Sequence, residues 1–210
     1  MELDFYNRQK QLKLKVPSSA TVIGLGGIGS WVALNLALTG TNKLVLIDYD
    51  RVEEHNLNRT PFTIQHIGLL KTQALSELII ERRDSESLNI IPISKRFEEL
   101  NTVELDMVKR TYLIVDCRDN LSPLPFKHKR VVKLGYDGHL ITIHFNPSNS
   151  FVMGDGNNGY TIVPSWLCPP QFLANVITTY ICALNHWPRK EKIVSLNLIE
   201  LTKKVLKVRK

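Results

Sequence analysis

The sequence predicts an α/β fold, a doubly wound sheet that is parallel in its first part and antiparallel in its C-terminal part. Two patterns support this prediction. Up to about residue 120, short and nearly continuous apolar runs alternate with segments of helical periodicity, as in parallel strands covered on both faces. Further on, apolar and polar residues alternate within single segments, which is typical of antiparallel strands.

A polar lead over residues 1–19 opens the chain, with a helix expected over Asp4–Leu14 that ends before Pro17. Four strands then follow from β-branched and apolar runs. They are expected at Thr21–Gly24, Lys43–Asp48, Leu88–Ile93 and Tyr112–Asp116. Three segments repeat apolar residues at the spacing of a helix face. These helices are expected at Gly27–Thr39, Gly68–Arg83 and Glu98–Lys109, and a polar connection at Arg51–Ile67.

The second half changes character after residue 120. Strands are expected at Val131–Leu134 and His139–Phe145, a loop at Asn146–Gly159, a helix at Phe172–Leu184, and a closing hairpin of Ile193–Leu201 and Lys204–Val208. No linker or internal repeat interrupts the chain, so we expect one domain over residues 1–210. Its parts would be the lead, a nucleotide-binding half at 20–120 and a C-terminal half at 121–210.

Composition indicates a soluble, cytoplasmic protein. The apolar fraction is 43% and the charged fraction 22%, without an apolar stretch long enough for a membrane span or a secretory leader. Three cysteines without a C-x-x-C pair favour a reducing compartment and predict no zinc site. The net charge is +7, but no aromatic residues interleave with the basic tail, so no nucleic-acid partner is expected.

A glycine-rich turn is the strongest local signal. Gly24, Gly26, Gly27 and Gly29 form a G-x-G-x-x-G pattern between an expected strand and an expected helix. In a Rossmann-like fold such a turn lets the backbone approach a phosphate, which meets the free N–H groups of the helix. Asp48 ends the next strand, where a carboxylate accepts hydrogen bonds from ribose hydroxyls. The sequence therefore predicts a nucleotide site.

The chain also resembles the adenylating superfamily of ubiquitin-activating-enzyme-like proteins, the MoeB/ThiF/HesA group. The resemblance rests on five segments that keep their order over residues 6–120. They are Tyr6-Asn7-Arg8-Gln9, the glycine turn, Asp48-Tyr49-Asp50-Arg51-Val52 with Asn56-Leu57-Asn58-Arg59, Ile67-Gly68-Leu69-Leu70-Lys71, and Asp116-Cys117-Arg118-Asp119-Asn120.

The resemblance implies a homodimer that uses ATP and Mg²⁺ to adenylate a carboxylate, often the C-terminus of a ubiquitin-like or sulfur-carrier protein. Asp48 would hold the ribose. Arg59 and Lys71 would bind the triphosphate, with Asn56 beside them. Asp119 would hold the metal, and Arg8 would reach the partner subunit's phosphates.

Two other functions stay open. An NAD-dependent oxidoreductase would use the same glycines and Asp48, although hydride transfer has no need of Arg8, Arg59, Lys71 or Asp119. A non-catalytic nucleotide-binding or scaffold protein is the second, because Pro123 and Pro125 stand where relatives have a helix of several turns.

Two further residues carry weaker expectations. Cys168 precedes an expected helix and is a weak candidate nucleophile, since a thiol near a helix N-terminus can ionise more easily. Asp50 is expected to cap the loop that follows it rather than to serve the site. Cys117 and Cys182 are expected to be structural.

Overall fold

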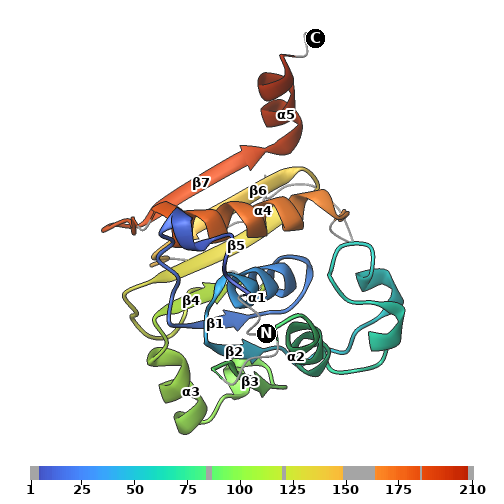
Figure 1. Cartoon of the computed structure of the whole chain (residues 1–210), viewed down its shortest axis with the longest axis vertical. Coiled ribbons are helices and arrows are strands. Elements are labelled where there is room, and N and C mark those ends of the chain that lie inside the picture. Colours follow the sequence, from blue (N-terminus) through green and yellow to red (C-terminus); the bar gives the residue numbers. More distant parts are fainter. Residues whose placement is uncertain (1–4, 84–86, 120–121, 149–163, 185, 208–210) are drawn as a thin grey trace.

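The computed structural model describes residues 5–83, 87–119, 122–148, 164–184 and 186–207. Its centre is a sheet of seven strands in the order β3-β2-β1-β4-β5-β6-β7 (Figure 1). The strands are β1 (Ser19–Ile23), β2 (Lys43–Ile47), β3 (Asn89–Ile93), β4 (Leu113–Asp116), β5 (Val131–Asp137), β6 (Leu140–Phe145) and β7 (Lys192–Asn197).

The sheet is parallel in its first part and antiparallel at its C-terminal side. β1 lies between β2 and β4, and all strands from β3 to β5 in the sheet order pair in parallel. β6 pairs antiparallel with both β5 and β7. The fold class expected from the sequence is confirmed.

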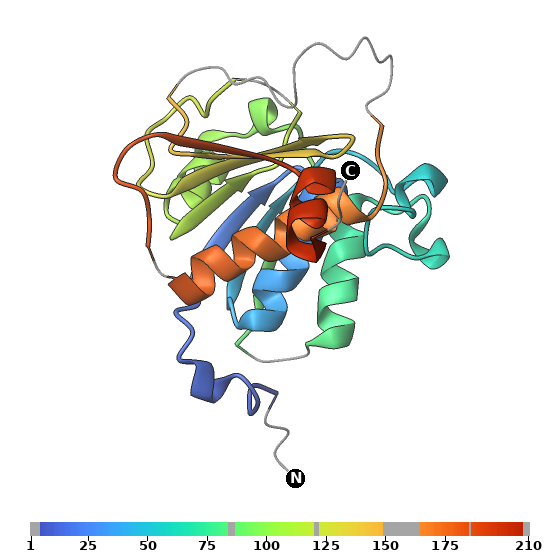
Figure 2. The same ribbon diagram turned by 90° about the horizontal axis from the view of Figure 1, so that it is seen from above.

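Helices cover both faces of the sheet. α1 (Gly27–Thr39), α2 (Lys71–Arg82) and α4 (Cys168–Thr179) lie on one face, as Figure 2 shows, and form the larger apolar core with it. α3 (Thr102–Lys109) packs on the opposite face through Val108, beside Phe97. None of the described helices is long and apolar enough to span a membrane.

The strand predictions hold to within a few residues, and the helix over Gly27–Thr39 has the expected ends. The helix expected over Glu98–Lys109 is shorter. Phe97–Glu99 forms a 3₁₀ turn, and α3 begins only at Thr102. Asn101 and Glu104 set this start, because each side chain accepts a hydrogen bond from the other's backbone N–H at 2.9 Å.

The N-terminal lead was wrongly predicted as a helix. Residues 5–9 form turns, and a single 3₁₀ turn follows at Lys10–Leu12. Contacts with the end of α1 explain the difference, since the Gln9 amide donates to the carbonyl of Thr39 at 2.7 Å. The Arg83 guanidinium also lies over the Tyr6 ring, 5.5 Å from its centre. Tertiary contacts therefore override the local helical preference.

The prediction of a closing hairpin was also wrong. β7 ends at Asn197, and α5 (Leu198–Leu206) follows directly in place of a second strand. The Asn197 side chain accepts hydrogen bonds from the N–H groups of Ile199 and Glu200, which caps the helix. The expected helix at Phe172–Leu184 instead begins at Cys168, and its last residues, Tyr180–Leu184, form a π-helical turn. Most of the expected loop at Asn146–Gly159 lies outside the described residues.

Candidate functional site

A cavity of about 370 Å³ opens at the carboxyl ends of the parallel strands. Its walls come from the ends of β1, β2, β4 and β5 and from the segment that follows β3. The chain leaves β1 toward β2 on one side, while β4 lies on the other, so the cavity sits at the point where the winding direction changes. Open α/β sheets bind their ligands at this point.

The glycine turn forms one wall and needs two of its glycines for steric reasons. Gly24 has φ +82°, which disfavours other residues. A Cβ on Gly29 would lie 1.8 Å from the carbonyl oxygen of Gly24, so only glycine fits there. Gly27 lies close to Tyr136 and Pro170, whereas a Cβ on Gly26 would meet no atom within 4 Å.

α1 starts at this turn without a side-chain cap. The first backbone N–H groups of a helix have no partner within the helix, and together with the helix dipole they attract an anion. The open space at Gly26 lies directly at this N-terminus. An anion can therefore bind at this turn without any movement of the protein.

Asp48 links the glycine turn to the end of β2. Its carboxylate oxygens accept hydrogen bonds from the N–H groups of Leu25 and Asp50, at 2.5 and 2.8 Å. Burial raises the pKa of Asp48 above its usual value, although the Lys71 ammonium and these two N–H groups act in the opposite direction. Each carboxylate oxygen can accept another hydrogen bond, so the residue can still receive a ribose hydroxyl.

The two predicted triphosphate cations lie on the cavity wall. Arg59 is half-buried, and its guanidinium contacts the His55 carbonyl and the Asn58 side chain. The Lys71 ammonium at the start of α2 lies 2.9 Å from the Asp50 carboxylate. Asp50, expected only to cap a loop, is thus the partner of a cavity cation.

Asn56 does not line the cavity. Its side-chain oxygen accepts a hydrogen bond from the N–H of Glu53, and its carbonyl accepts those of Arg59 and Thr60. Through these hydrogen bonds Asn56 shapes the loop that carries Arg59.

Asp119 is exposed on the cavity wall, and its side chain forms no hydrogen bond or ion pair with another described residue. Mg²⁺ prefers one or two carboxylates that act together with substrate phosphates. A free carboxylate beside a phosphate-binding turn fits this preference. Within the part of the chain that the structure describes, no group of three His, Cys, Asp or Glu residues could hold a metal by protein ligands alone.

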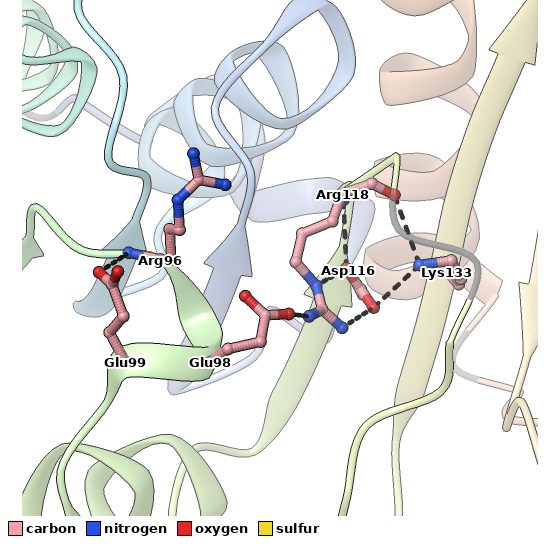
Figure 3. A network of polar contacts seen from close by, with 6 residues as sticks. All are labelled: Arg96, Glu98, Glu99, Asp116, Arg118 and Lys133. Carbon is pink, nitrogen blue, oxygen red and sulfur yellow. Dashed lines mark hydrogen bonds and ion pairs between the residues drawn. The ribbon is translucent and has the colours of Figure 1, made fainter.

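Further residues in and beside the cavity had no role predicted from the sequence. The Arg96 guanidinium lies over the ring of Tyr49, 3.7 Å from its centre, and both residues line the cavity. Arg118 lines it as well, and its guanidinium binds Asp116 and Glu98 (Figure 3). Asp116 also pairs with Lys133, which is completely buried in β5. A lysine within an apolar strand is a signal of such a buried pair, because unpaired buried lysines are rare.

Arg8 lies far from the cavity of its own chain. Its neighbour Gln9 binds Thr39, the last residue of α1, whereas the glycine turn lies at the first residue of that helix. A helix of 13 residues is about 20 Å long, which exceeds the reach of an arginine. Figure 2 shows the N-terminal segment at this far end of α1.

The three cysteines differ in exposure, with Cys182 buried, Cys117 half-buried and Cys168 exposed. Cys168 is exposed at the start of α4 and is not among the residues that line the cavity. Burial raises the pKa of the Cys182 thiol to about 11, which keeps it protonated. Burial also raises the pKa of Cys117, which packs beneath the glycine turn near Gly24 and Gly29.

Comparison with known proteins gives a consistent result. Residues 1–144 match the family model described as ThiF family. The chain is 34% identical over 116 residues to the adenylyltransferase and sulfurtransferase MOCS3 of Drosophila willistoni, covering 54% of this chain and 24% of that protein. It is also 34% identical over 128 residues to the ubiquitin-like modifier-activating enzyme 5 of Dictyostelium discoideum, covering 56% of this chain and 33% of that protein.

Solved structures share the fold. Escherichia coli MccB, crystallised with AMPCPP and MccA, has a TM-score of 0.63 at 18% identity, covering 94% of this chain and 72% of that chain. This similarity concerns the fold alone. The chain spans only about a quarter to a third of the curated relatives named above.

Proposed function

This chain belongs to the ThiF family, and from that membership and the cavity we propose that it activates a carboxylate by adenylation. ATP would be the nucleotide, and pyrophosphate would leave. The observation that carries the proposal is that the glycine turn, Asp48, Arg59, Lys71 and Asp119 all line the same cavity.

The charges of the cavity suit this reaction. A carboxylate that attacks the α-phosphate brings one anion toward another, so fixed cations must stabilise the charge that develops. Arg59 presents a planar fork that matches phosphate oxygens, and Lys71 adds a compact charge. Hydride transfer has no comparable need for cations, so an NAD-dependent reaction explains the cavity less well.

Each residue has a defined task in the proposal. The N–H groups at Gly26 and at the start of α1 receive a phosphate, and Asp48 holds the ribose through its remaining lone pairs. Lys71 exchanges Asp50 for a phosphate oxygen. Asp119 is the residue that would hold Mg²⁺, which supplies charge neutralisation at the phosphates when bound.

The acceptor is proposed from the relatives. The names of MOCS3 and of the ubiquitin-like modifier-activating enzyme describe adenylation, sulfur transfer and activation of a ubiquitin-like modifier. We therefore expect the reacting carboxylate to be the C-terminus of a ubiquitin-like or sulfur-carrier protein. We further propose a homodimer, because Arg8 is too far from its own cavity to act there.

Two measurements test the function. Calorimetric titration with ATP and Mg²⁺ should give a clear binding signal, and the same titration with NAD should not. The chain should then exchange labelled pyrophosphate into ATP when a peptide or small protein ending in Gly-Gly is added. Binding of NAD without binding of ATP would exclude the adenylation proposal.

A non-catalytic role is the alternative that one observation favours. The described residues 122–130 form no helix, as Pro123 and Pro125 led us to expect where the resemblance implies a helix of several turns. A protein that binds ATP with Mg²⁺ but exchanges no pyrophosphate with any Gly-Gly acceptor would fit this alternative.

A further inference from the structure

We propose that Lys133, Asp116 and Arg118 form a positioning unit that fixes the carboxylate of Asp119 for Mg²⁺. The inference rests on the proposed function, because it assumes that Asp119 holds the metal. These three residues stand outside the set that the sequence predicted to touch the nucleotide.

The unit is built around a buried ion pair. The side chains of Lys133 and Asp116 are 0% and 1% exposed, and their charged atoms lie 3.2 Å apart. Burial of two charges is costly, and removal of only one partner leaves the other uncompensated. A buried ion pair of this kind contributes little net free energy to folding. We therefore infer that its role is to position neighbouring groups.

Arg118 is held by this pair through both its backbone and its side chain. Its N–H and its Nε each donate to Asp116 Oδ1, at 3.1 and 2.9 Å, and its Nη2 donates to Oδ2 at 3.0 Å. Its carbonyl accepts a hydrogen bond from the Lys133 ammonium at 3.4 Å. Figure 3 shows how Arg118 lies between Asp116, Lys133 and Glu98 through these contacts.

The carbonyl contact matters most for Asp119. The carbonyl of Arg118 belongs to the peptide group whose nitrogen is that of Asp119, so Lys133 restricts the rotation of this peptide. Among the described residues, the Asp119 side chain has no hydrogen-bond or ion-pair partner of its own. The position of its carboxylate therefore depends on the backbone before it, and that backbone depends on Lys133 and Asp116.

The outer side of the unit is closed by Glu98 and Phe97. The Arg118 Nη1 lies 2.5 Å from the Glu98 carboxylate, and the guanidinium lies 4.5 Å from the centre of the Phe97 ring. Two cations and two carboxylates thus balance within the cluster. This balance lets Arg118 stay in place beside the cavity while leaving the charge of Asp119 available.

The test measures metal dependence without turnover. Affinity for the analogue AMPCPP is followed by calorimetry in EDTA and over a range of Mg²⁺ concentrations, for the wild type and for Lys133→Met. Residues that orient metal ligands typically change metal affinity by about 10- to 100-fold. In Lys133→Met, we expect half of the Mg²⁺-dependent gain in AMPCPP affinity to require at least roughly tenfold more Mg²⁺ than in the wild type. The AMPCPP affinity in EDTA should be unchanged.

Val115→Ala is the matched control, because Val115 is fully buried in β4 next to Asp116. It should lower the melting temperature and leave the Mg²⁺ midpoint unchanged. Arg118→Lys keeps the charge but loses the two-point contact with Asp116. It should raise the midpoint as well, and it serves as the test if Lys133→Met does not fold.

The outcomes separate the two proposals. A folded Lys133→Met or Arg118→Lys variant with the wild-type Mg²⁺ midpoint would overturn the positioning unit. An equal shift in Val115→Ala would also overturn it, since the effect would then follow from stability. A wild-type chain that binds no AMPCPP under any condition would instead overturn the proposed function.

Discussion

The Lys71 ammonium lies 2.9 Å from the Asp50 carboxylate on the wall of the cavity. The lysine side chain is 10% exposed and the aspartate side chain 44% exposed. Asp50 therefore neutralises Lys71 from the solvent side in the free protein. An incoming phosphate can replace this carboxylate, because the inner part of the lysine stays fixed in α2.

Lys71→Met should weaken ATP binding by about 10- to 100-fold, which corresponds to a lost charge-assisted hydrogen bond of roughly 1.5–3 kcal/mol. Asp50→Asn should leave ATP affinity equal or higher, because it removes the competing anion and keeps the lysine. Calorimetry measures both variants. Lys43→Met, at the opposite end of β2, is the control and should bind like the wild type. Weaker binding in Asp50→Asn would contradict a competitive role for Asp50.

Two glycine substitutions should separate folding from binding. Gly29→Ala places a Cβ 1.8 Å from the Gly24 carbonyl, so we expect a loss of more than about 3 kcal/mol in the free energy of unfolding, beyond ordinary overpacking. Gly26→Ala meets no protein atom within 4 Å and should fold normally. Its methyl group would fill the space for the phosphate and reduce ATP affinity at least roughly tenfold.

Urea unfolding tests the folding part of this prediction, and ATP titration tests the binding part. Normal ATP binding by Gly26→Ala would move the phosphate away from the start of α1.

Asp119→Ala should abolish the gain in ATP affinity that Mg²⁺ provides, while affinity in EDTA stays the same. The residue is exposed, so the melting temperature should change little. Asp106→Ala is a suitable control, since Asp106 is an exposed carboxylate on α3 that pairs with Arg110 at 2.8 Å. A Mg²⁺ response that survives in Asp119→Ala would place the metal on other residues.

Asp48 should make the chain less stable as the pH rises. Burial raises the pKa of Asp48 above the ordinary 3.8, so the folded chain binds a proton over a range where the unfolded chain has lost it. The free energy of unfolding therefore falls as the pH rises from 3.8 through the raised pKa. Asp48→Asn lacks this titration.

Urea unfolding of both proteins between about pH 4 and pH 7 checks the sign. We expect the stability of the wild type relative to Asp48→Asn to decrease across this range. An increase would mean that Lys71 and the two N–H groups outweigh burial and that the pKa is lowered instead.

Local patterns were enough to predict most of the fold. The first strands and α1 follow from apolar runs between turn residues, and tertiary contacts reinforce them. The predictions of a helix in the lead and of a hairpin at the C-terminus were wrong for different reasons. Contacts of Gln9 and Tyr6 with distant residues keep the lead irregular, whereas the last segment is a helix whose N-terminus Asn197 caps.

The site was predictable only where residues belong to known motifs. Asp48, Arg59, Lys71 and Asp119 stand at motif positions, and all four line the cavity. Arg96 and Lys133 stand in no motif. Their place depends on how β3 and β5 align with their neighbours in the sheet, which pairs residues far apart in the chain. Local periodicity holds no information about that alignment.

Arg8 offers a test of assembly, because α1 separates it from the cavity of its own chain. In a homodimer its guanidinium would serve the partner's phosphates, so Arg8→Ala and Asp119→Ala chains should each be inactive in pyrophosphate exchange. Mixing them should restore activity, since one of the two sites in a mixed dimer has both groups. About a quarter of the wild-type activity is the most to expect, because half of the dimers are mixed and each has one intact site.

Lys10→Ala, at an exposed residue of the same lead, is the control and should be active alone. A mixture without activity, or a monomer in sedimentation at the assay concentration, would contradict action between subunits.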